Sequence, residues 1–303
     1  MQLGDLAFAE LLDVRVHEPE RIAKAHAARR RRTSVTRDGM LFIVAADHTA
    51  RGMVSLGEDR RAMADRRSML ERILVALDHP RVDGVLGSGD VLDDLVVLGA
   101  LEDKFVAGTM NRGGLAGARW ELDDRFTAYD ADHIVASNFD AGKMLLRIDD
   151  EDVGTASTLE ACGRAVRSLN DQRVIAMVEP IPYTKDQSGR AVWDEDPDKL
   201  LRAVAVSAAL GGSSAYTWLK VQATANVAAV ASVTTQPLLL LGGALGSDPS
   251  VVFDAWAEGL ALPTVRGLVA GRALLYPQDG EVHGAIDRAA GLVEEAAKRK
   301  AGT

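Results

Sequence analysis

The sequence predicts an α/β protein, a (β/α)8 TIM barrel with an N-terminal helical extension. Eight short apolar runs recur along the chain, and each is followed by a longer segment with helical spacing. These units spread over about 250 residues, the usual size of such a barrel. An open dinucleotide-binding sheet would carry its glycine fingerprint after an early strand. Here the best match, Gly242 to Gly246, comes late and lacks the regular spacing.

The first four predicted strands alternate with helices. A turn signal at Arg37-Asp38-Gly39 precedes the first strand, which ends at Asp47. The second ends in a Gly-Ser-Gly-Asp turn, and the third leads into the glycine-rich segment Gly108 to Gly117. The strands are expected at Leu41–Ala46, Val82–Leu86, Lys104–Ala107 and Lys143–Ile148, and the helices at Val91–Leu101 and Ser157–Leu169.

The second half of the chain repeats the pattern. A long loop, Ile181 to Asp196, is expected between the fifth strand and its helix. The strands are expected at Val174–Val178, Ala215–Val221, Leu238–Leu241 and Val265–Ala270, and the helices at Pro197–Leu210, Val251–Leu260 and Val282–Lys298.

We expect one domain over residues 1–303, with residues 1–36 as a helical extension and 281–303 holding a closing helix. The extension contains the basic run Arg29-Arg30-Arg31-Arg32, which follows an alanine-rich stretch. Cations are favourable at the C-terminal end of a helix, so we interpret this run as a solvated helix end and not as a polyanion site.

Composition narrows the class of protein. The formal charge of -9 argues against a nucleic-acid partner. Cys162 is the single cysteine, so no internal disulfide can form. No signal-peptide pattern and no apolar stretch of about 20 residues is present, so we expect no membrane partner and a cytoplasmic location. A homo-oligomer is the expected assembly.

Lys220 is the most unusual residue, because it lies inside the apolar run Ala215 to Val221. Burial disfavours an ammonium ion and lowers its pKa, which would give a free amine able to attack a carbonyl. The alternative is a lysine at a strand end that extends into water.

Polar residues mark the carboxyl ends of other predicted strands, where barrels place their chemistry. These residues are Asp47, Lys143 and Glu179. Each has a structural explanation: Asp47 as a helix cap, Lys143 as a solvated strand start, and Glu179 as a solvent-facing carboxylate. Two lysines and two carboxylates that converge would need to pair, however, and such pairing shifts pKa values at active sites.

The last two strands indicate a phosphate site, because their loops form the usual phosphate site of a barrel. Gly242 and Gly243 follow the seventh strand, and Gly271 and Arg272 follow the eighth. Arg272 would bind the phosphate or, alternatively, pair with a surface carboxylate. Arg51 and Arg112 are candidates for a second anionic group on the substrate.

No cofactor is indicated. The six histidines show no metal-binding spacing, and only His48 is next to the candidate site. We therefore expect no metal, although carboxylate-bound magnesium remains an alternative.

Several segments resemble the class I, Schiff-base aldolases related to tagatose-bisphosphate aldolase and deoxyribose-phosphate aldolase. The chain departs from tagatose-bisphosphate aldolase after the first and third strands. It is most similar to an actinobacterial aldolase-like barrel family associated with myo-inositol catabolism. The segments that carry the resemblance are Phe42–His48, Gly142–Asp149, Val178–Pro180, Trp218–Val221 and Gly267–Ala273.

The resemblance implies that Lys220 is the Schiff-base lysine. It also implies cleavage of 2-deoxy-5-keto-gluconate 6-phosphate into dihydroxyacetone phosphate and malonic semialdehyde. Lys143 and Glu179 would then assist Lys220 as a neighbouring cation and a general acid and base. Two alternatives remain: a metal-dependent barrel lyase or isomerase, and a non-catalytic sugar-phosphate-binding barrel.

Overall fold

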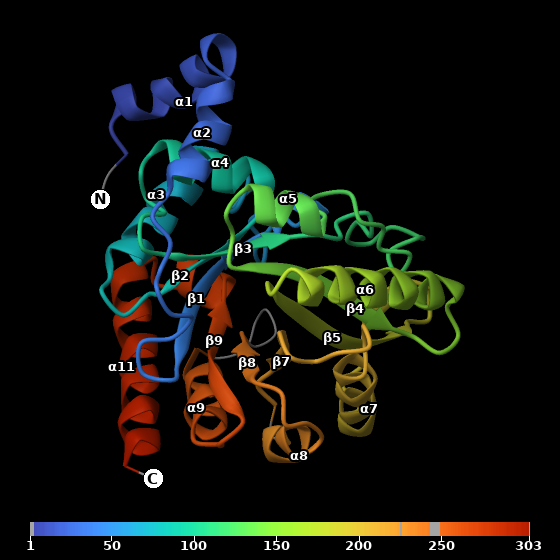
Figure 1. Cartoon of the computed structure of the whole chain (residues 1–303). Helices are drawn as coiled ribbons and strands as arrows, with labels where there is room; N and C mark the ends of the chain where they lie inside the picture. Colours follow the sequence, from blue (N-terminus) through green and yellow to red (C-terminus); the bar gives the residue numbers. More distant parts are fainter. Residues whose placement is uncertain (1–2, 225, 243–248, 303) are drawn as a thin grey trace.

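Eight parallel strands close into a barrel, which confirms the predicted fold class. The structure, a computed structural model, describes residues 3–224, 226–242 and 249–302 of the 303-residue chain (Figure 1). Neighbouring strands pair in the order β4-β3-β2-β1-β9-β8-β7-β5, and a β4–β5 pairing closes the ring. The strands are β1 (Leu41–Ala46), β2 (Gly84–Gly87), β3 (Phe105–Thr109), β4 (Ala141–Ile148), β5 (Ile175–Lys185), β7 (Thr217–Gln222), β8 (Leu238–Leu241) and β9 (Val265–Ala270).

Helices surround the barrel, and two more form the N-terminal extension at one end of the molecule (Figure 1). The longest, α11, runs along the outside near the two termini. The helices are α1 (Asp5–His17), α2 (Glu20–Ala28), α3 (Arg66–Asp78), α4 (Gly89–Val97), α5 (Ala131–Ala136), α6 (Val153–Asp171), α7 (Pro197–Ala208), α8 (Val227–Ser232), α9 (Pro249–Leu260), α10 (Arg272–Leu275) and α11 (Val282–Ala301), with a 3-10 turn, η1, at Thr49–Arg51.

Two apolar layers stabilise the barrel, because alternate residues of each strand point to opposite sides. Residues such as Phe42, Val44 and Val178 pack outward against the helices. The other layer fills the barrel interior with Leu41, Ile43, Ala45, Leu86, Phe105, Ala107, Ala141, Ile175, Met177, Leu239 and Val269, with Trp218 packed against them. This interior layer is the floor on which the candidate site is built.

The predicted loop Ile181 to Asp196 instead contains a β-hairpin. The strand β5 continues to Lys185, and the chain returns as β6 (Ala191–Trp193), which pairs antiparallel with it. Pro180 and Pro182 favour a loop in the sequence. They are tolerated because β5 pairs with β7 only as far as Val178, so beyond that residue this edge of β5 has no β7 partner that would need an amide donor.

The arginine run follows a helix and Arg30 and Arg31 are exposed, as predicted, but the prediction of a solvated helix end is wrong for Arg29. Arg29 follows α2 and is only 3% exposed, and it donates hydrogen bonds to the carbonyl oxygens of Leu101, Lys104 and Asn138. Arg31 pairs with Asp140, and Arg32 pairs with Asp83. These partners precede β2, β3 and β4, so the run binds the extension to the amino ends of the strands, opposite the candidate site.

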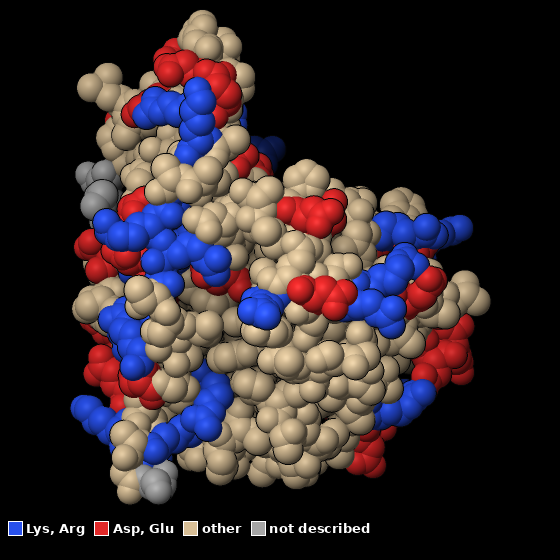
Figure 2. Space-filling model, in the orientation of Figure 1, with Lys and Arg blue, Asp and Glu red and all other residues tan. Residues whose placement is uncertain are grey.

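Charges of both signs alternate over the face shown in Figure 2. Lysine and arginine side chains lie beside aspartate and glutamate around the N-terminal helices, so this face carries no continuous basic patch. Within the described part of the chain, no helix combines the length and the apolar character needed to cross a membrane.

Candidate functional site

A layer of polar side chains lies directly above the apolar floor of the barrel. Each member follows an interior residue of its own strand by two positions and therefore points to the same side. The members are Asp47 after β1, Thr109 on β3, Lys143 on β4, Glu179 on β5 and Lys220 on β7. The four predicted catalytic residues are only 2–7% exposed.

These four side chains form one continuous chain of contacts. Lys143 Nζ lies 2.6 Å from Glu179 Oε2 and 3.3 Å from Asp47 Oδ2. Lys220 Nζ donates a hydrogen bond of 3.1 Å to the same Glu179 oxygen. The structure thus brings together the predicted lysines and carboxylates from β1, β4, β5 and β7, which lie far apart in the sequence.

Burial and pairing oppose each other in setting the ionisation of this cluster. Burial would raise the pKa of Glu179, but Lys143 and Lys220 outweigh it and hold that pKa at about 2. Burial likewise opposes ionisation of Asp47, whereas Arg112 and Lys143 lower its pKa well below the usual value. Burial lowers the pKa of Lys143 to about 8, although both carboxylates raise it. At neutral pH the cluster therefore holds two carboxylates and a cationic Lys143.

The two arginines proposed for a second anionic group have different surroundings. Arg112 joins the cluster: its guanidinium pairs with Asp47, and Nε donates a 2.6 Å hydrogen bond to the hydroxyl of Thr109. Arg51 lies elsewhere, with Nε donating to the carbonyl of Gly114 and a 3.5 Å contact to Glu121. Of the two, Arg112 is next to Lys143 and Arg51 holds the segment after β3.

The sequence prediction missed a second buried ionic network, centred on Arg147. This arginine is fully buried and pairs with Glu121 at 2.5 Å and Asp124 at 2.9 Å. Its guanidinium also lies over the ring of Tyr183. The sequence does contain a signal for this network, because Arg147 is a charged residue inside an apolar strand, four positions after Lys143. The network fastens the segment between β3 and α5 across the mouth of the barrel.

The predicted phosphate-binding residues are only partly described. Gly242 follows β8, whereas Gly243 lies outside the described residues. Gly271 precedes α10, and a Cβ atom there would come within 2.4 Å of His48 Cε1, so close packing of His48 requires a glycine. Burial lowers the pKa of His48 to about 3, which leaves a neutral imidazole.

Arg272 begins α10 directly after β9, whereas Arg112 lies in the segment that follows β3. Burial lowers its pKa, and the negative charge of Glu179 opposes this effect, so Arg272 is within electrostatic reach of the cluster. With the described residues it forms neither an ion pair nor a side-chain hydrogen bond. Its guanidinium therefore retains capacity for an anionic ligand.

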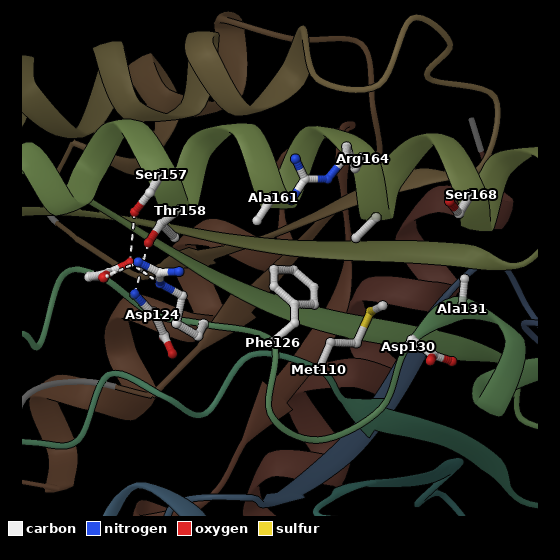
Figure 3. Close-up of a pocket in the computed structure, with 13 residues that line it drawn as sticks. Met110, Asp124, Phe126, Asp130, Ala131, Ser157, Thr158, Ala161, Arg164 and Ser168 are labelled. Carbon is white, nitrogen blue, oxygen red and sulfur yellow. Dashed lines mark hydrogen bonds and ion pairs between the residues drawn. The ribbon is translucent and has the colours of Figure 1, made fainter.

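A separate cavity of about 440 Å³ lies outside the barrel, between α6 and the segment that follows β3 (Figure 3). Met110 and Phe126 line its apolar part, and Thr158 donates its hydroxyl proton to the carbonyl of Leu122. None of the predicted site residues lines this cavity. Within the described ranges, no group of three His, Cys, Asp or Glu side chains is arranged to hold a metal ion.

Comparison with known proteins identifies relatives of the whole chain. The crystal structure of Cgl0159 from Corynebacterium glutamicum is 45% identical, with a TM-score of 0.93 and coverage of 96% of this chain and 98% of that chain. A Schiff-base-forming fructose-1,6-bisphosphate aldolase is 17% identical, with a TM-score of 0.61 and coverage of 90% and 99%.

A fructose-bisphosphate aldolase from Slackia heliotrinireducens is 14% identical, with a TM-score of 0.61 and coverage of 92% of both chains. At such low identity these two aldolases share the fold. No curated protein matches the chain in sequence. The family model described as Cgl0159-like matches residues 39–290. The chain therefore belongs to the Cgl0159-like family.

Proposed function

We propose that this protein is a class I aldolase that cleaves a ketose phosphate through a Schiff base on Lys220. The observation that carries the proposal is the shared acceptor: Lys143 Nζ and Lys220 Nζ lie 2.6 Å and 3.1 Å from one oxygen of Glu179. A nucleophilic amine, a second cation and a general acid and base are the groups this reaction needs. The shared fold with Schiff-base-forming aldolases supports the same reaction class.

The reaction begins when the free amine of Lys220 adds to the substrate ketone to form a carbinolamine. Loss of water, with a proton supplied through Glu179, gives the iminium ion. Glu179 then accepts the proton of the β-hydroxyl as the carbon-carbon bond breaks, and the bonding electron pair passes into the iminium to give an enamine. Protonation of the enamine carbon and hydrolysis of the resulting iminium release the ketone product and regenerate Lys220.

The remaining charged groups bind and orient the substrate. Asp47 holds Lys143 in place, and Lys143 contacts a substrate oxygen as a cation. The backbone near Gly242, Gly243 and Gly271, together with Arg272, would bind the phosphate. A carboxylate on the substrate would meet Arg112 beside Lys143, whereas Arg51 holds the loop.

The balance of charge favours an anionic substrate. The cations Lys143, Arg112 and Arg272 outnumber the carboxylates of Asp47 and Glu179. The first substrate to assay is 2-deoxy-5-keto-gluconate 6-phosphate, whose cleavage would give dihydroxyacetone phosphate and malonic semialdehyde. Its phosphate would bind near Arg272, and its carboxylate would bind near Arg112.

Borohydride trapping tests the proposal directly. Reduction of the protein with dihydroxyacetone phosphate should convert the iminium to a stable secondary amine on the peptide that contains Lys220. Mass spectrometry should find the adduct in the wild type and not in Lys220→Met. Exposed Lys199 offers the control, because Lys199→Met should be labelled normally.

Other outcomes would favour the alternatives. Loss of cleavage after treatment with a chelator, without an adduct, would favour a metal-dependent lyase or isomerase. Binding of the sugar phosphate without turnover, and retained in Lys220→Met, would favour a non-catalytic binding protein.

A further inference from the structure

A second cavity lies at the carboxyl end of β7, the strand that carries Lys220. Its volume is about 430 Å³, and it is bounded by the end of β6, the start of α7 and the segment after β7. The lining residues that bear on its chemistry are Trp193, Asp194, Glu195, Gln222, Thr224 and Asn226.

Gln222 links this cavity to Lys220. The two residues are separated by two positions on β7, so their side chains point to the same side, with their Cα atoms about 6.6 Å apart along the strand. The pairing of Lys220 with Leu239 and of Gln222 with Leu241 continues the same alternation on β8. Gln222 therefore lies one layer closer to the mouth of the barrel than Lys220.

Two buried polar atoms that line this cavity have no hydrogen-bond partner among the described residues. Gln222 is 7% exposed, and its Oε1 has no hydrogen-bond partner among the described residues. The hydroxyl oxygen of Thr224 is likewise buried without a partner there. A buried polar atom without a partner destabilises the folded state. A ligand that supplies hydroxyl groups would remove this cost.

The lining chemistry distinguishes this cavity from the cationic cluster. It combines an aromatic ring, two amides, a hydroxyl and the carboxylates of Asp194, Glu195 and Asp196. No lysine or arginine lines it, although Lys199 pairs with Asp194 from α7, so Glu195 and Asp196 supply the negative charge. Carboxylates repel a phosphate or a carboxylate, whereas they accept hydrogen bonds from hydroxyl groups. An aromatic ring packs against the carbon-hydrogen face of a sugar. This set of groups suits an uncharged, hydroxyl-bearing ligand.

We propose that this cavity is the subsite for the uncharged, hydroxylated part of the substrate, with Gln222 and Thr224 as specificity-determining residues. The proposal rests on the aldolase function proposed above. The phosphate of the substrate binds at the cationic cluster, and hydroxyl groups on its aldehyde portion face Gln222. Malonic semialdehyde carries no hydroxyl group, so this subsite predicts that a hydroxylated aldehyde is the better partner of dihydroxyacetone phosphate.

Aldol condensation tests the subsite. Dihydroxyacetone phosphate is combined with D-glyceraldehyde or with propanal, which lacks both hydroxyl groups, and kcat/KM is measured for each aldehyde. The wild type should prefer glyceraldehyde by at least about 10-fold, the value of one good hydrogen bond. Gln222→Met should lower this preference about 10-fold, mainly by reducing kcat/KM for glyceraldehyde. An unchanged preference in Gln222→Met, or no preference in the wild type, would overturn the subsite.

Gln236 provides a matched control. It is a buried glutamine whose Oε1 also lacks a partner among the described residues, but it precedes β8 at the opposite end of the barrel. Gln236→Met should leave the preference between aldehydes unchanged. If it lowers that preference as much as Gln222→Met does, the effect is a general loss of packing and the proposal is wrong.

A measurement without turnover separates this inference from the aldolase proposal. Saturation-transfer NMR with erythritol, an uncharged polyol, should give a signal with the wild type and with Lys220→Met, and a weaker signal with Gln222→Met. Failure of borohydride trapping with this pattern intact would reject the aldolase and retain the polyol site. Trapping at Lys220 with no erythritol signal from the wild type would reject the polyol site alone.

Discussion

Lys143 and Lys220 both contact Glu179, but at different distances. This difference favours Lys143 as the cation and Lys220 as the nucleophile. Lys143 is closer, at 2.6 Å, and also contacts Asp47, so two carboxylates hold its proton. Its pKa of about 8 still leaves it charged at neutral pH. Among the carboxylates of the described residues, Lys220 contacts Glu179 alone, at 3.1 Å. Of the two amines, Lys220 is therefore the one with fewer contacts to lose when it attacks a carbonyl.

Glu179→Gln tests the role of this shared carboxylate. The amide keeps the size of the side chain but can neither accept the β-hydroxyl proton nor supply one for dehydration. We expect kcat for cleavage to fall by about 10²–10⁴-fold, measured by release of dihydroxyacetone phosphate. Glu160→Gln removes a carboxylate from an exposed pair on α6 and should leave kcat unchanged. A kcat within about twofold of wild type in Glu179→Gln would contradict the assignment.

At the scale of the elements, the buried side chain of Arg29 attaches the N-terminal extension to the barrel. Replacing Arg29 by methionine keeps an unbranched apolar stem but removes the side-chain donor to three carbonyl groups, of which Leu101 keeps the amide of Lys104 as a donor. We expect the free energy of unfolding to fall by about 1–3 kcal/mol, measured by urea unfolding.

The neighbouring Arg30 is the control for this change. It pairs with Asp103 at the surface, where both side chains are more than half exposed. Arg30→Met should leave the stability unchanged within error, because exposed ion pairs contribute little. Equal losses from both substitutions would contradict the view that Arg29 anchors the extension.

The same elements show how far the sequence can predict the molecule. Strands β1, β8 and β9 have the predicted bounds, because each is an apolar run that ends at a turn signal. The cluster of Asp47, Lys143, Glu179 and Lys220 was predictable because closed barrels gather the ends of their strands at one face. The partners of Arg29 and Arg147 depend on segments distant in the chain, and a local pattern carries no information on such contacts.

The molecule as a whole uses its buried carboxylates to join strands around the mouth of the barrel. The pair of Asp47, after β1, with Lys143, on β4, joins strands that are not neighbours. The pairs of Glu179 with Lys143 and with Lys220 reinforce the neighbouring strand pairings β4–β5 and β5–β7. These pairs stabilise the barrel only while the carboxylates are ionised.

Acid should therefore weaken the barrel. The pKa of Glu179 is lowered from 4.5 to about 2, and that of Asp47 is lowered in the same direction. A lowered carboxylate pKa contributes stability that is complete above the unfolded value and is lost as the pH falls towards the folded value. For Glu179 this window runs from about pH 4.5 down to about pH 2. Urea unfolding at pH 6 and pH 3 should show a smaller difference in Glu179→Gln than in the wild type.

Asp103 supplies the comparison for this titration. Its pKa is also lowered, by the hydrogen bond from Arg30, but the pair is exposed and solvent screens it. Asp103→Asn should therefore leave the difference in stability between pH 6 and pH 3 as it is in the wild type. Suppose that Asp103→Asn reduces that difference and Glu179→Gln does not. The loss of stability in acid would then come from surface ion pairs, and the buried ion pairs would not hold the strands together.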